Sequence, residues 1–414
     1  MRIGVEIMGG GEVITRIAAR GDGVTASGHH IAGGVPGDVI GEDGGLIPGP
    51  NRQTPPCLHF ERCGGCQLQH VNDHAYGNYL VDRIISALAA QGIDAPDIMS
   101  PILSPPYSRR RVALRAQSIS KKIILGYAEG ASHTLVDLRA CPVMDPILYD
   151  MIRPLRALMA ILITSRRVAD LRMTLTDQGV DLLIAGVEAQ GLAVAEALND
   201  FAIMHKLARL SIDEGYGPSV RWEPEPVTVT FGGVAVGMPH NAFLQATAHG
   251  EAALVGVVRS VVKGAAHVAD LFSGLGTFAL ATGAIGTTGA KVHAVEGARD
   301  AALALQMAAN QMKRALSVEH RDLFRRPLTP AELARFDAVI LDPPRAGAYE
   351  QVEQLAQSIV AQLVYVSCNP ATFARDAKLL IAGGYALKKI TPVGQFRWST
   401  HVELAAVFGR VVPS

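Results

Sequence analysis

Residues 265–278, Ala-Ala-His-Val-Ala-Asp-Leu-Phe-Ser-Gly-Leu-Gly-Thr-Phe, decide the fold class of this 414-residue chain. An apolar run typical of a buried strand passes into a short glycine-rich loop and then into a helical segment. Glycines let the backbone of such a loop approach a ligand closely, but a tight turn between a strand and a helix uses the same residues. The stretch therefore predicts a βα unit and, taken alone, is weak support for a ligand site.

Buried-strand runs alternate with helical segments from Ala265 to the C-terminus. Three further runs follow the first, at residues 291–295, 338–341 and 363–366. Such alternation is typical of parallel βαβ units in a doubly wound sheet, whose ligands lie at the carboxyl ends of the strands. We therefore predict an α/β fold with a Rossmann-like domain over residues 237–414.

Glycine and acidic residues follow directly on these predicted strands. Gly274 and Gly276 lie in the first loop, and Glu296 comes about 20 residues later, where a carboxylate can accept both hydroxyls of a ribose. Asp322 could accept from an adenine amino group, or could equally cap a helix. Because the loop has neither a third glycine nor a phosphate-clamping lysine, it suits an adenosyl donor better than a dinucleotide.

Two further motifs end strands at the same predicted edge. Asp342-Pro-Pro-Arg345 follows the run 338–341, and its prolines hold the carboxylate at the end of the sheet. Cys368 ends another buried run and precedes a turn at Asn369-Pro370. A buried cysteine is usually an inert apolar side chain. The position of Cys368 in the same layer as Asp342 favours a nucleophile instead.

D-P-P-R-x-G at residues 342–347, followed by L-V-Y-x-S-C-N-x-x-T at residues 363–372, resembles the signature of the RNA uracil-5-methyltransferase family. The resemblance implies that S-adenosylmethionine is the methyl donor, RNA is the substrate, Cys368 is the nucleophile and Glu403 is the base. It also implies a donor pocket lined by Gln245, Phe272, Gly274, Gly276, Thr277, Glu296, Asp322 and Asp342.

Methylation of uracil at C5 explains the need for a thiol. C5 is a weak nucleophile until a thiolate adds at C6 and turns the ring into an enolate. After methyl transfer a base must remove the C5 proton so that the cysteine can leave. Glu403 is the candidate base, and His401 is the alternative because residues two apart face the same side of a strand. Glu403 could instead be a surface carboxylate in an edge strand.

The chain departs from the family pattern at several positions. Ser273 and Thr277 replace Cys and Asn in the donor loop, and Thr247 occupies the last place of F-x-Q-x-N. The residues Arg397-Trp398-Ser399 replace Pro-His-Thr shortly before the base. This last change lies nearest to the chemistry, so we expect it to alter the surroundings of Glu403.

Four of the five cysteines predict a metal site. Cys57, Cys63 and Cys66 form a C-x5-C-G-G-C run in glycine-rich backbone, and Cys141 would be the fourth ligand. Spacing alone is equally compatible with zinc and with an iron–sulfur cluster. The continuation of the run to Gln69-His70 resembles the cluster-bearing members of the family and implies [4Fe-4S]. Four thiolates leave no open iron position, so we expect a role in structure and RNA positioning.

The N-terminal half is predicted to hold two further domains. Residues 1–50 contain short apolar runs broken by glycine or proline and resemble the small TRAM-like β-barrel that binds RNA in some members. The unit is short and passes into a predicted linker at residues 44–56, so we expect an incomplete barrel. Residues 51–236 are predicted to form a central α+β domain with the cysteines and an amphipathic helix near residues 75–92.

The charge of the chain is balanced, with 38 basic and 38 acidic residues, so any RNA surface has to be local. No apolar segment of about 18 residues lacks charges or glycines, so we expect a soluble, cytoplasmic monomer with no membrane partner. The local candidates for RNA binding are Arg109, Arg110, Arg111, Arg115, Lys121 and Lys122.

Cysteine cluster and N-terminal unit together resemble the branch of the family that modifies 23S ribosomal RNA. A transfer-RNA uridine-5-methyltransferase is the first alternative, although those members typically lack the cysteines. A catalytically inactive iron–sulfur RNA-binding protein is an alternative from a different class. The presence of Cys368, Asp342 and Glu403 argues against an inactive protein.

Overall fold

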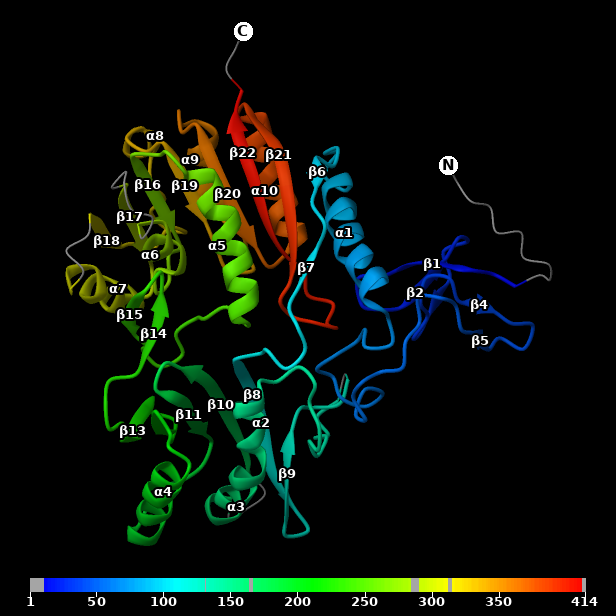
Figure 1. Cartoon of the computed structure of the whole chain (residues 1–414), viewed down its shortest axis with the longest axis vertical. Helices are drawn as coiled ribbons and strands as arrows, with labels where there is room; N and C mark the ends of the chain where they lie inside the picture. Colours follow the sequence, from blue (N-terminus) through cyan, green and yellow to red (C-terminus); the bar gives the residue numbers. More distant parts are fainter. Residues whose placement is uncertain (1–10, 131, 164–166, 284–289, 312–314, 412–414) are drawn as a thin grey trace.

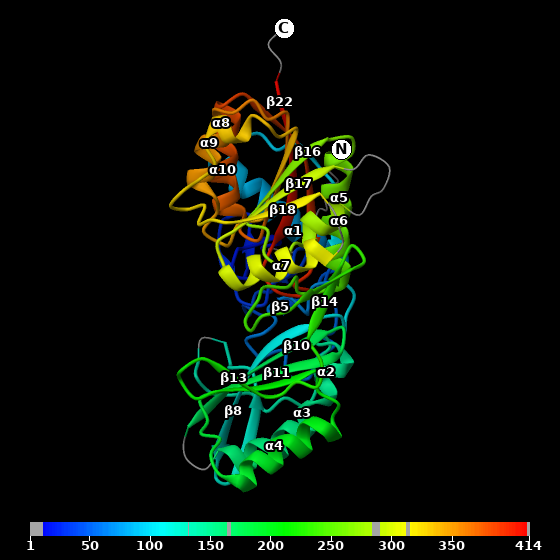
Figure 2. The same cartoon turned by 90° about the vertical axis from the view of Figure 1, so that its left-hand side faces the viewer.

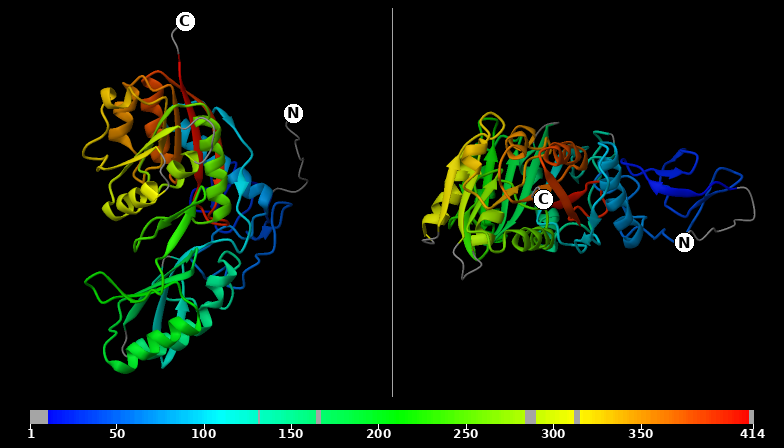
Figure 3. Two further views of the ribbon diagram at one scale, coloured as in Figure 1. Left: turned by 60° about the vertical axis from the view of Figure 1, so that its left-hand side comes forward. Right: turned by 90° about the horizontal axis from the view of Figure 1, so that it is seen from above.

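The computed structural model describes residues 11–130, 132–163, 167–283, 290–311 and 315–411. Figure 1 shows a C-terminal α/β domain at one end of the molecule and a central domain at the other. A small N-terminal unit projects to one side, which Figure 3 shows from above. Residues 1–10 of the predicted N-terminal unit lie outside the described residues.

A nine-stranded sheet forms the middle of the C-terminal domain. Its strand order is β18-β17-β16-β19-β20-β22-β21-β6, and β7 also pairs with β21. The first five strands in this order are mutually parallel, and β22 joins β20 in the antiparallel sense. The bounds are β6 (Asp97–Ile98), β7 (Ile102–Leu103), β16 (His267–Leu271), β17 (Lys291–Glu296), β18 (Leu316–His320), β19 (Ala338–Leu341), β20 (Gln362–Ser367), β21 (Tyr385–Gly394) and β22 (Glu403–Arg410).

Helices cover both faces of this sheet, as Figure 2 shows. The helices α5, α6 and α7 lie on one face, and α1, α8, α9 and α10 lie on the other. Because both faces are covered, β19 is buried at every position. This arrangement confirms the predicted doubly wound, Rossmann-like α/β domain. The bounds are α1 (Asp73–Ala89), α5 (Ala248–Val262), α6 (Thr277–Gly283), α7 (Arg299–Gln311), α8 (Pro330–Leu333), α9 (Tyr349–Ala356) and α10 (Pro370–Ala382).

Parts of the predicted central domain, residues 51–236, pack against the C-terminal sheet. The helix α1 buries Leu80, Ile84 and Leu88 in the same core as α10, and β6 and β7 pair with β21. The hairpin of β14 (Thr228–Phe231) and β15 (Val234–Gly237) packs against α6 and α7. The chain therefore enters the C-terminal domain before residue 237, which local patterns along the sequence do not indicate.

The central domain has a six-stranded sheet in the order β13-β12-β11-β10-β8-β9. The helices α2, α3 and α4 pack against it and share its apolar core. None of the described helices in the chain is long and apolar enough to cross a membrane. The bounds are β8 (Arg111–Ile119), β9 (Lys122–Gly126), α2 (Pro146–Asp150), α3 (Ile152–Leu162), β10 (Val168–Thr176), β11 (Gly179–Ala185), α4 (Leu192–Met204), β12 (Arg209–Asp213) and β13 (Pro218–Trp222).

Residues 11–50 form two small sheets joined by one isolated bridge between Val13 and Val39. Among these described residues the strand pairs do not close into a TRAM-like barrel. The linker prediction for residues 44–56 is wrong at Leu46 and Ile47, which pair with β4 before Pro48 interrupts the strand. The bounds are β1 (Ile14–Ile17), β2 (Gly23–Thr25), β3 (His30–Ile31), β4 (Val39–Ile40) and β5 (Leu46–Ile47).

Asp38 holds the two small sheets together. Its side chain is fully buried and accepts hydrogen bonds from the amides of Val35 and Gly49, each at 2.8 Å. The same carboxylate forms an ion pair with Arg52. The strands of the unit are only two to four residues long, so a fully partnered buried carboxylate has a large share in its stability.

We expect Asp38→Ala to destabilise the N-terminal unit by about 2–4 kcal/mol, because two amides and a guanidinium lose their acceptor. Hydrogen exchange of residues 11–50 measures the effect as a loss of amide protection. Asp43→Ala is the matched control, since exposed Asp43 accepts only the amide of Gly45 in the tip of the β4–β5 turn. Equal protection in the two variants would contradict the anchoring role of Asp38.

Candidate active site

The parallel register brings the ends of four strands to one edge of the sheet. Leu271 of β16 pairs with Val295 of β17 and with Leu341 of β19, and Leu341 pairs with Tyr365 of β20. Because parallel neighbours end at the same level, the loops that follow them lie side by side. These loops carry most of the predicted site residues, namely Phe272, Gly274, Gly276, Thr277, Glu296, Asp342 and Cys368.

The donor loop after β16 has a backbone conformation that favours glycine. Gly274 and Gly276 have φ angles of 56° and 88°, and a Cβ on Gly276 would lie 2.4 Å from Leu305. Phe272 also has a positive φ, 62°, a conformation that costs free energy for a residue with a side chain. The amide of Gly274 donates to Glu296 Oε2 at 2.8 Å. The loop and the carboxylate of Glu296 therefore hold each other in place.

Asp270 supports the start of α6 from below the loop. It is fully buried, and its Oδ2 accepts the amide of Ala279 at 2.7 Å, two residues after Thr277 begins the helix. Burial raises the pKa of Asp270 to about 7. A buried acid with this pKa is partly neutral at physiological pH, which limits the negative charge beneath the donor loop.

Asp322 lies just beyond β18, in the turn that leads toward α8. Its Oδ1 accepts the amides of Phe324 at 3.0 Å and Arg325 at 3.3 Å, so the carboxylate closes a turn and does not cap a helix. The ring of Phe324 lies 5.4 Å from the ring of Phe272 in the donor loop. The turn that holds Asp322 thus faces the donor loop with an aromatic side chain on each side.

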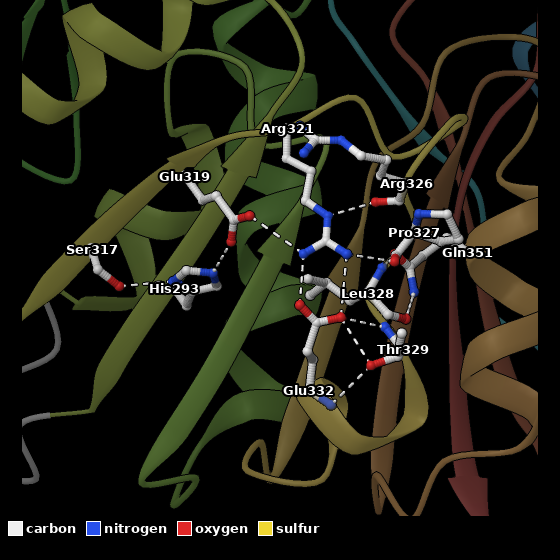
Figure 4. Close-up of polar contacts among 10 residues, drawn as sticks. All are labelled: His293, Ser317, Glu319, Arg321, Arg326, Pro327, Leu328, Thr329, Glu332 and Gln351. Atoms are coloured by element: carbon white, nitrogen blue, oxygen red, sulfur yellow. Dashed lines mark hydrogen bonds and ion pairs between the residues drawn. The ribbon is translucent and has the colours of Figure 1, made fainter.

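Arg321 anchors this turn to the body of the domain, as Figure 4 shows. Its guanidinium donates to Glu332 at 2.7 Å and 3.2 Å, and to the carbonyl oxygens of Arg326 and Pro327 at 2.6 Å and 2.7 Å. The hydrogen bonds from Arg321, together with those from Thr329, lower the pKa of Glu332 to about 2, so the carboxylate is ionised at neutral pH. Arg321 therefore fixes the path of the chain on both sides of Asp322.

Cys368 follows β20 directly and lies half-buried before α10. The start of α10 is hydrogen-bonded to the turn that follows Asp342. The side chains of Asn369 and Thr372 both donate to the carbonyl of Arg345 in that turn, at 3.0 Å and 3.1 Å. Burial, assisted by the negative charges of Glu403 and Asp342, raises the pKa of Cys368 to about 11, while Arg345 opposes this rise. The free thiol is therefore protonated at neutral pH and requires added positive charge to become a nucleophile.

Glu403 is the first residue of β22 and is only 4% exposed. The alternative of a surface carboxylate in an edge strand is excluded, because β22 lies between β20 and β21 and the side chain of Glu403 is buried. Burial raises the pKa of Glu403 to about 7, although hydrogen bonding and the charge of Arg345 oppose the rise. A carboxylate with this pKa can accept a proton and release it again near neutral pH.

His401 does not share a strand face with Glu403, as the spacing had suggested. It precedes β22, its side chain is on the surface, and its Nδ1 lies 3.0 Å from the guanidinium of Arg345. Although one side of the imidazole ring faces solvent, partial burial of the ring and the charges of Arg345 and Arg109 lower the pKa of His401. The geometry favours Glu403 over His401 as the base.

Gln245 and Asp342 complete the edge of the site next to Glu403. Gln245 Nε2 lies 3.4 Å from Asp342 Oδ2, and Gln245 Oε1 accepts from Gln395 at 2.7 Å. Burial, followed by the negative charge of Glu403, raises the pKa of Asp342 well above its ordinary value. Sequence patterns missed Gln395, because it lies in no motif that distinguishes it from other glutamines. Arg345 was visible within Asp-Pro-Pro-Arg, but its place between Cys368, Glu403 and His401 was not.

The unusual residues Arg397 and Trp398 hold the loop before the base. Arg397 forms an ion pair with Asp73 of α1 at 2.5 Å, and the carbonyl of Trp398 accepts the amides of both Gln67 and Leu68 at 2.9 Å. Trp398 has a φ of 60° and is 4% exposed. Arg397 and Trp398 therefore bind the loop that precedes Glu403 to α1 and to the segment that directly follows Cys66.

The four other cysteines, Cys57, Cys63, Cys66 and Cys141, line one cavity of about 50 Å³. Burial raises the pKa of Cys66 to about 12, and the three neighbouring thiols add to the rise. Within the described part of the chain, no group of three or more His, Cys, Asp or Glu side chains is arranged to hold a metal ion.

The predicted basic cluster is divided by the fold. Arg110 forms an ion pair with Glu251 at 2.5 Å, Arg115 pairs with Asp170 at 3.1 Å, and Lys122 pairs with Asp137 at 3.5 Å. Arg109 and Arg111 instead line a cavity of about 400 Å³ together with Arg172.

Aromatic side chains lie beside two of these three arginines. Arg109 lies 5.5 Å from the ring of Phe396, and Arg111 lies 5.3 Å from the ring of Phe243, which is 60% exposed. Burial and the charges of the other arginines lower the pKa of Arg111. The cavity is therefore electropositive, with apolar rings in reach of its guanidinium groups.

The sequence model of the family described as tRNA (Uracil-5-)-methyltransferase matches residues 234–411. An uncharacterized RNA methyltransferase from Zymomonas mobilis is 50% identical, over 96% of this chain and 99% of its own length. A 23S rRNA (uracil(1939)-C(5))-methyltransferase from Pectobacterium atrosepticum is 31% identical, over 88% of this chain and 81% of its own.

A solved structure shares the fold. The tRNA (uracil-54, C5)-methyltransferase of Pyrococcus abyssi, in complex with S-adenosyl-L-homocysteine, superposes with a TM-score of 0.73 and 21% sequence identity. The match covers 96% of this chain and 100% of that one. At this identity the likeness concerns the fold alone.

We expect Arg321→Ala to weaken the binding of S-adenosylhomocysteine about tenfold, the equivalent of roughly 1.4 kcal/mol, because the turn with Asp322 and Phe324 loses its anchor. Isothermal titration calorimetry measures the change in Kd. Arg167→Ala removes an exposed ion pair with Glu188 in the central domain and should leave the Kd unchanged. An unchanged Kd in Arg321→Ala would show that the anchor has no part in donor binding.

Proposed function

This chain belongs to the RNA uracil-5-methyltransferase family, and we propose that it methylates C5 of a uridine by transient addition of Cys368 to C6 of the ring. The observation that carries the proposal is the meeting of Cys368, Asp342 and Glu403 at one edge of the sheet, beside the glycine loop. The negative charge of Glu403 contributes to the raised pKa of both Asp342 and Cys368, and that of Asp342 contributes to the raised pKa of Cys368. A nucleophile and a base with a pKa near 7 are the two groups that this reaction requires.

S-adenosylmethionine would lie across the donor loop. We assign Glu296 to its ribose, the Phe272–Phe324 pair with Asp322 to its adenine, and Gln245 with Asp342 to its amino-acid end. When bound, the donor supplies an electrophilic methyl group on a positively charged sulfur. A positive charge near Cys368 and Asp342 stabilises both the thiolate and the carboxylate, so we expect donor binding to lower the pKa of both groups.

The reaction would then proceed through addition of the thiolate, transfer of the methyl group and elimination of the thiolate. Cys368 loses its proton to water, and the thiolate adds to C6, so that the C5–C6 double-bond electrons form an enolate. The nucleophilic C5 takes the methyl group, and the donor departs as the neutral thioether. Glu403 removes the remaining proton from C5, and the C6–sulfur bond breaks to restore the thiolate and the aromatic ring. Glu403 finally releases its proton to water.

RNA would bind over the electropositive cavity between the central domain and the catalytic edge. Arg109, Arg111 and Arg172 can neutralise phosphates, and the exposed ring of Phe243 can stack on a base. We propose 23S ribosomal RNA as the substrate, because the relative at 31% identity is named for that activity. The transfer-RNA enzyme with the same fold makes transfer RNA the alternative.

The chemistry is tested by trapping with RNA that contains 5-fluorouridine, because fluorine at C5 cannot be removed as a proton. We expect the protein with S-adenosylmethionine to form a covalent complex that survives denaturing electrophoresis and is missing in Cys368→Ala. The two variants should bind S-adenosylhomocysteine equally, which serves as the folding control. Ribosomal and transfer RNA transcripts in parallel reactions decide the substrate. If no adduct forms and no uridine RNA is methylated, the protein is an inactive RNA-binding member.

We also propose that the four cysteines around the cavity bind a [4Fe-4S] cluster. The four thiols line one cavity, and a donor set of four thiolates suits iron–sulfur chemistry. The continuation of the cysteine run to Gln69-His70, which resembles the cluster-bearing members of the family, favours this cluster over zinc. Cys57, Cys63, Cys66 and Cys141 would each supply one ligand and hold the segment 57–70 in its folded path.

Removal of iron should change the surroundings of Trp398, because the backbone amides of Gln67 and Leu68, which follow Cys66, donate to the carbonyl of Trp398. In a Trp222→Phe background Trp398 is the only remaining tryptophan of two. We expect anaerobically purified protein to be brown with about four irons per chain, and chelation to shift Trp398 fluorescence to longer wavelength and increase its quenching by acrylamide. A colourless protein with one zinc would refute the cluster. Unchanged fluorescence after iron loss would refute its connection to the catalytic loop.

A further inference from the structure

Gln395 lies at the centre of the catalytic edge, although no motif marks it. It follows the last residue of β21 and is 1% exposed, which is unusual for a long amide side chain. The helix α5 packs closely against it, since a Cβ on Gly250 would lie 2.6 Å from the Cβ of Gln395. A buried amide in so tight a space has to satisfy its polar atoms locally.

Each polar atom of the Gln395 amide has a partner. Nε2 donates to Glu403 Oε2 at 2.8 Å and to Gln245 Oε1 at 2.7 Å, so both of its hydrogens are used. Oε1 accepts the backbone amide of Ala246 at 3.0 Å. The backbone bond determines which end of the amide is the oxygen, and therefore directs the two N–H groups toward Glu403 and Gln245.

The same amide joins the base to the donor side of the site. Gln245, which accepts from Gln395, lies with its own Nε2 3.4 Å from Asp342 Oδ2. Asp342, Gln245, Gln395 and Glu403 therefore form a continuous row of polar groups. Two neutral amides separate two carboxylates that would otherwise repel each other in a buried site.

We propose that Gln395 is a positioning residue for proton abstraction, which holds the carboxylate of Glu403 ionised and aimed at C5 through its Nε2–H. This inference rests on the proposed methylation of uridine C5. A hydrogen bond to the ionised form of a buried acid favours that form. The other charged or titratable groups that act on Glu403 or lie beside it are Arg345, Asp342 and Cys368. Of these groups only Arg345 favours the ionised form of Glu403, and it acts through its charge. Gln395 is therefore the one neutral hydrogen-bond donor among the groups named here that stabilises this carboxylate.

Loss of the Gln395 amide should slow the step after methyl transfer. Burial raises the pKa of Glu403, and without Gln395 only the charge of Arg345 would oppose this rise. A larger fraction of Glu403 would then be protonated at neutral pH. The acid limb of the pH–rate profile, which reports ionisation of the base, should then move to higher pH. The methylated RNA would remain attached to Cys368 for longer, because its C5 proton is removed slowly.

Gln395→Met tests this inference, because methionine keeps the length of the side chain and removes both donors. With unmodified uridine RNA we expect kcat at pH 7 to fall about 10- to 100-fold, as for loss of a hydrogen bond to a charged group. The fall should be largely recovered near pH 9, and the Cys368–RNA adduct should accumulate on denaturing gels. Glu403→Gln should show the same adduct with no recovery at high pH.

Gln357→Leu, at the exposed end of α9, is the matched control and should behave as the wild type. If Gln395→Met does not fold, Gln395→Glu keeps the shape of the side chain and should move the acid limb further upward, because a second carboxylate faces Glu403. A fall in kcat without a shifted limb or an adduct would mean a merely structural role and overturn the inference. If wild type forms no adduct with 5-fluorouridine RNA, the proposed function itself has failed.

Discussion

The level at which the parallel strands end is the constraint on which the active site depends. Leu271, Leu341 and Tyr365 stand in register across β16, β19 and β20, so the residues that follow them emerge at one edge. If β20 slipped by one residue against β19, Cys368 would move away from Asp342. The side chains of β20 would also turn to the opposite face of the sheet. The apolar layers on both faces of the sheet prevent this slip, because every position of β19 is already buried.

Burial gives this edge its chemistry. Water would keep Asp342, Glu403 and Cys368 at their ordinary pKa values, whereas the apolar surroundings raise all three. The thiol of Cys368 is thereby held protonated near neutral pH, the pKa of Asp342 is raised well above its ordinary value, and the pKa of Glu403 lies at about 7. The site therefore gains its negative charge mainly when a cationic donor is bound. The side-chain amides of Gln245 and Gln395 lie between the two carboxylates and hydrogen-bond to them.

Distant parts of the chain converge on the loop before the base. Asp73 of α1 and the amides of Gln67 and Leu68 all contact residues 397–398, more than three hundred positions later in the sequence. The replacement of Pro-His by Arg397-Trp398 is explained by these contacts, since the guanidinium reaches Asp73 and the indole fills a buried space. The segment that follows Cys66 thus holds the loop before Glu403 in place through backbone hydrogen bonds to Trp398.

The sequence by itself determined the Rossmann-like fold and placed Cys368 and Asp342 directly after predicted strands, because both features are local. Strand and helix periodicity is set by residues within one element, and Cys368 and Asp342 each follow directly on a buried run. Only the tertiary structure decided that Glu403 is buried and that His401 is exposed. The same holds for the packing of α1 in the C-terminal core and for the hydrogen bond from Gln395 to Glu403. These depend on the order of strands within the sheet and on contacts between segments far apart in the chain, and neither leaves a periodic pattern in the sequence.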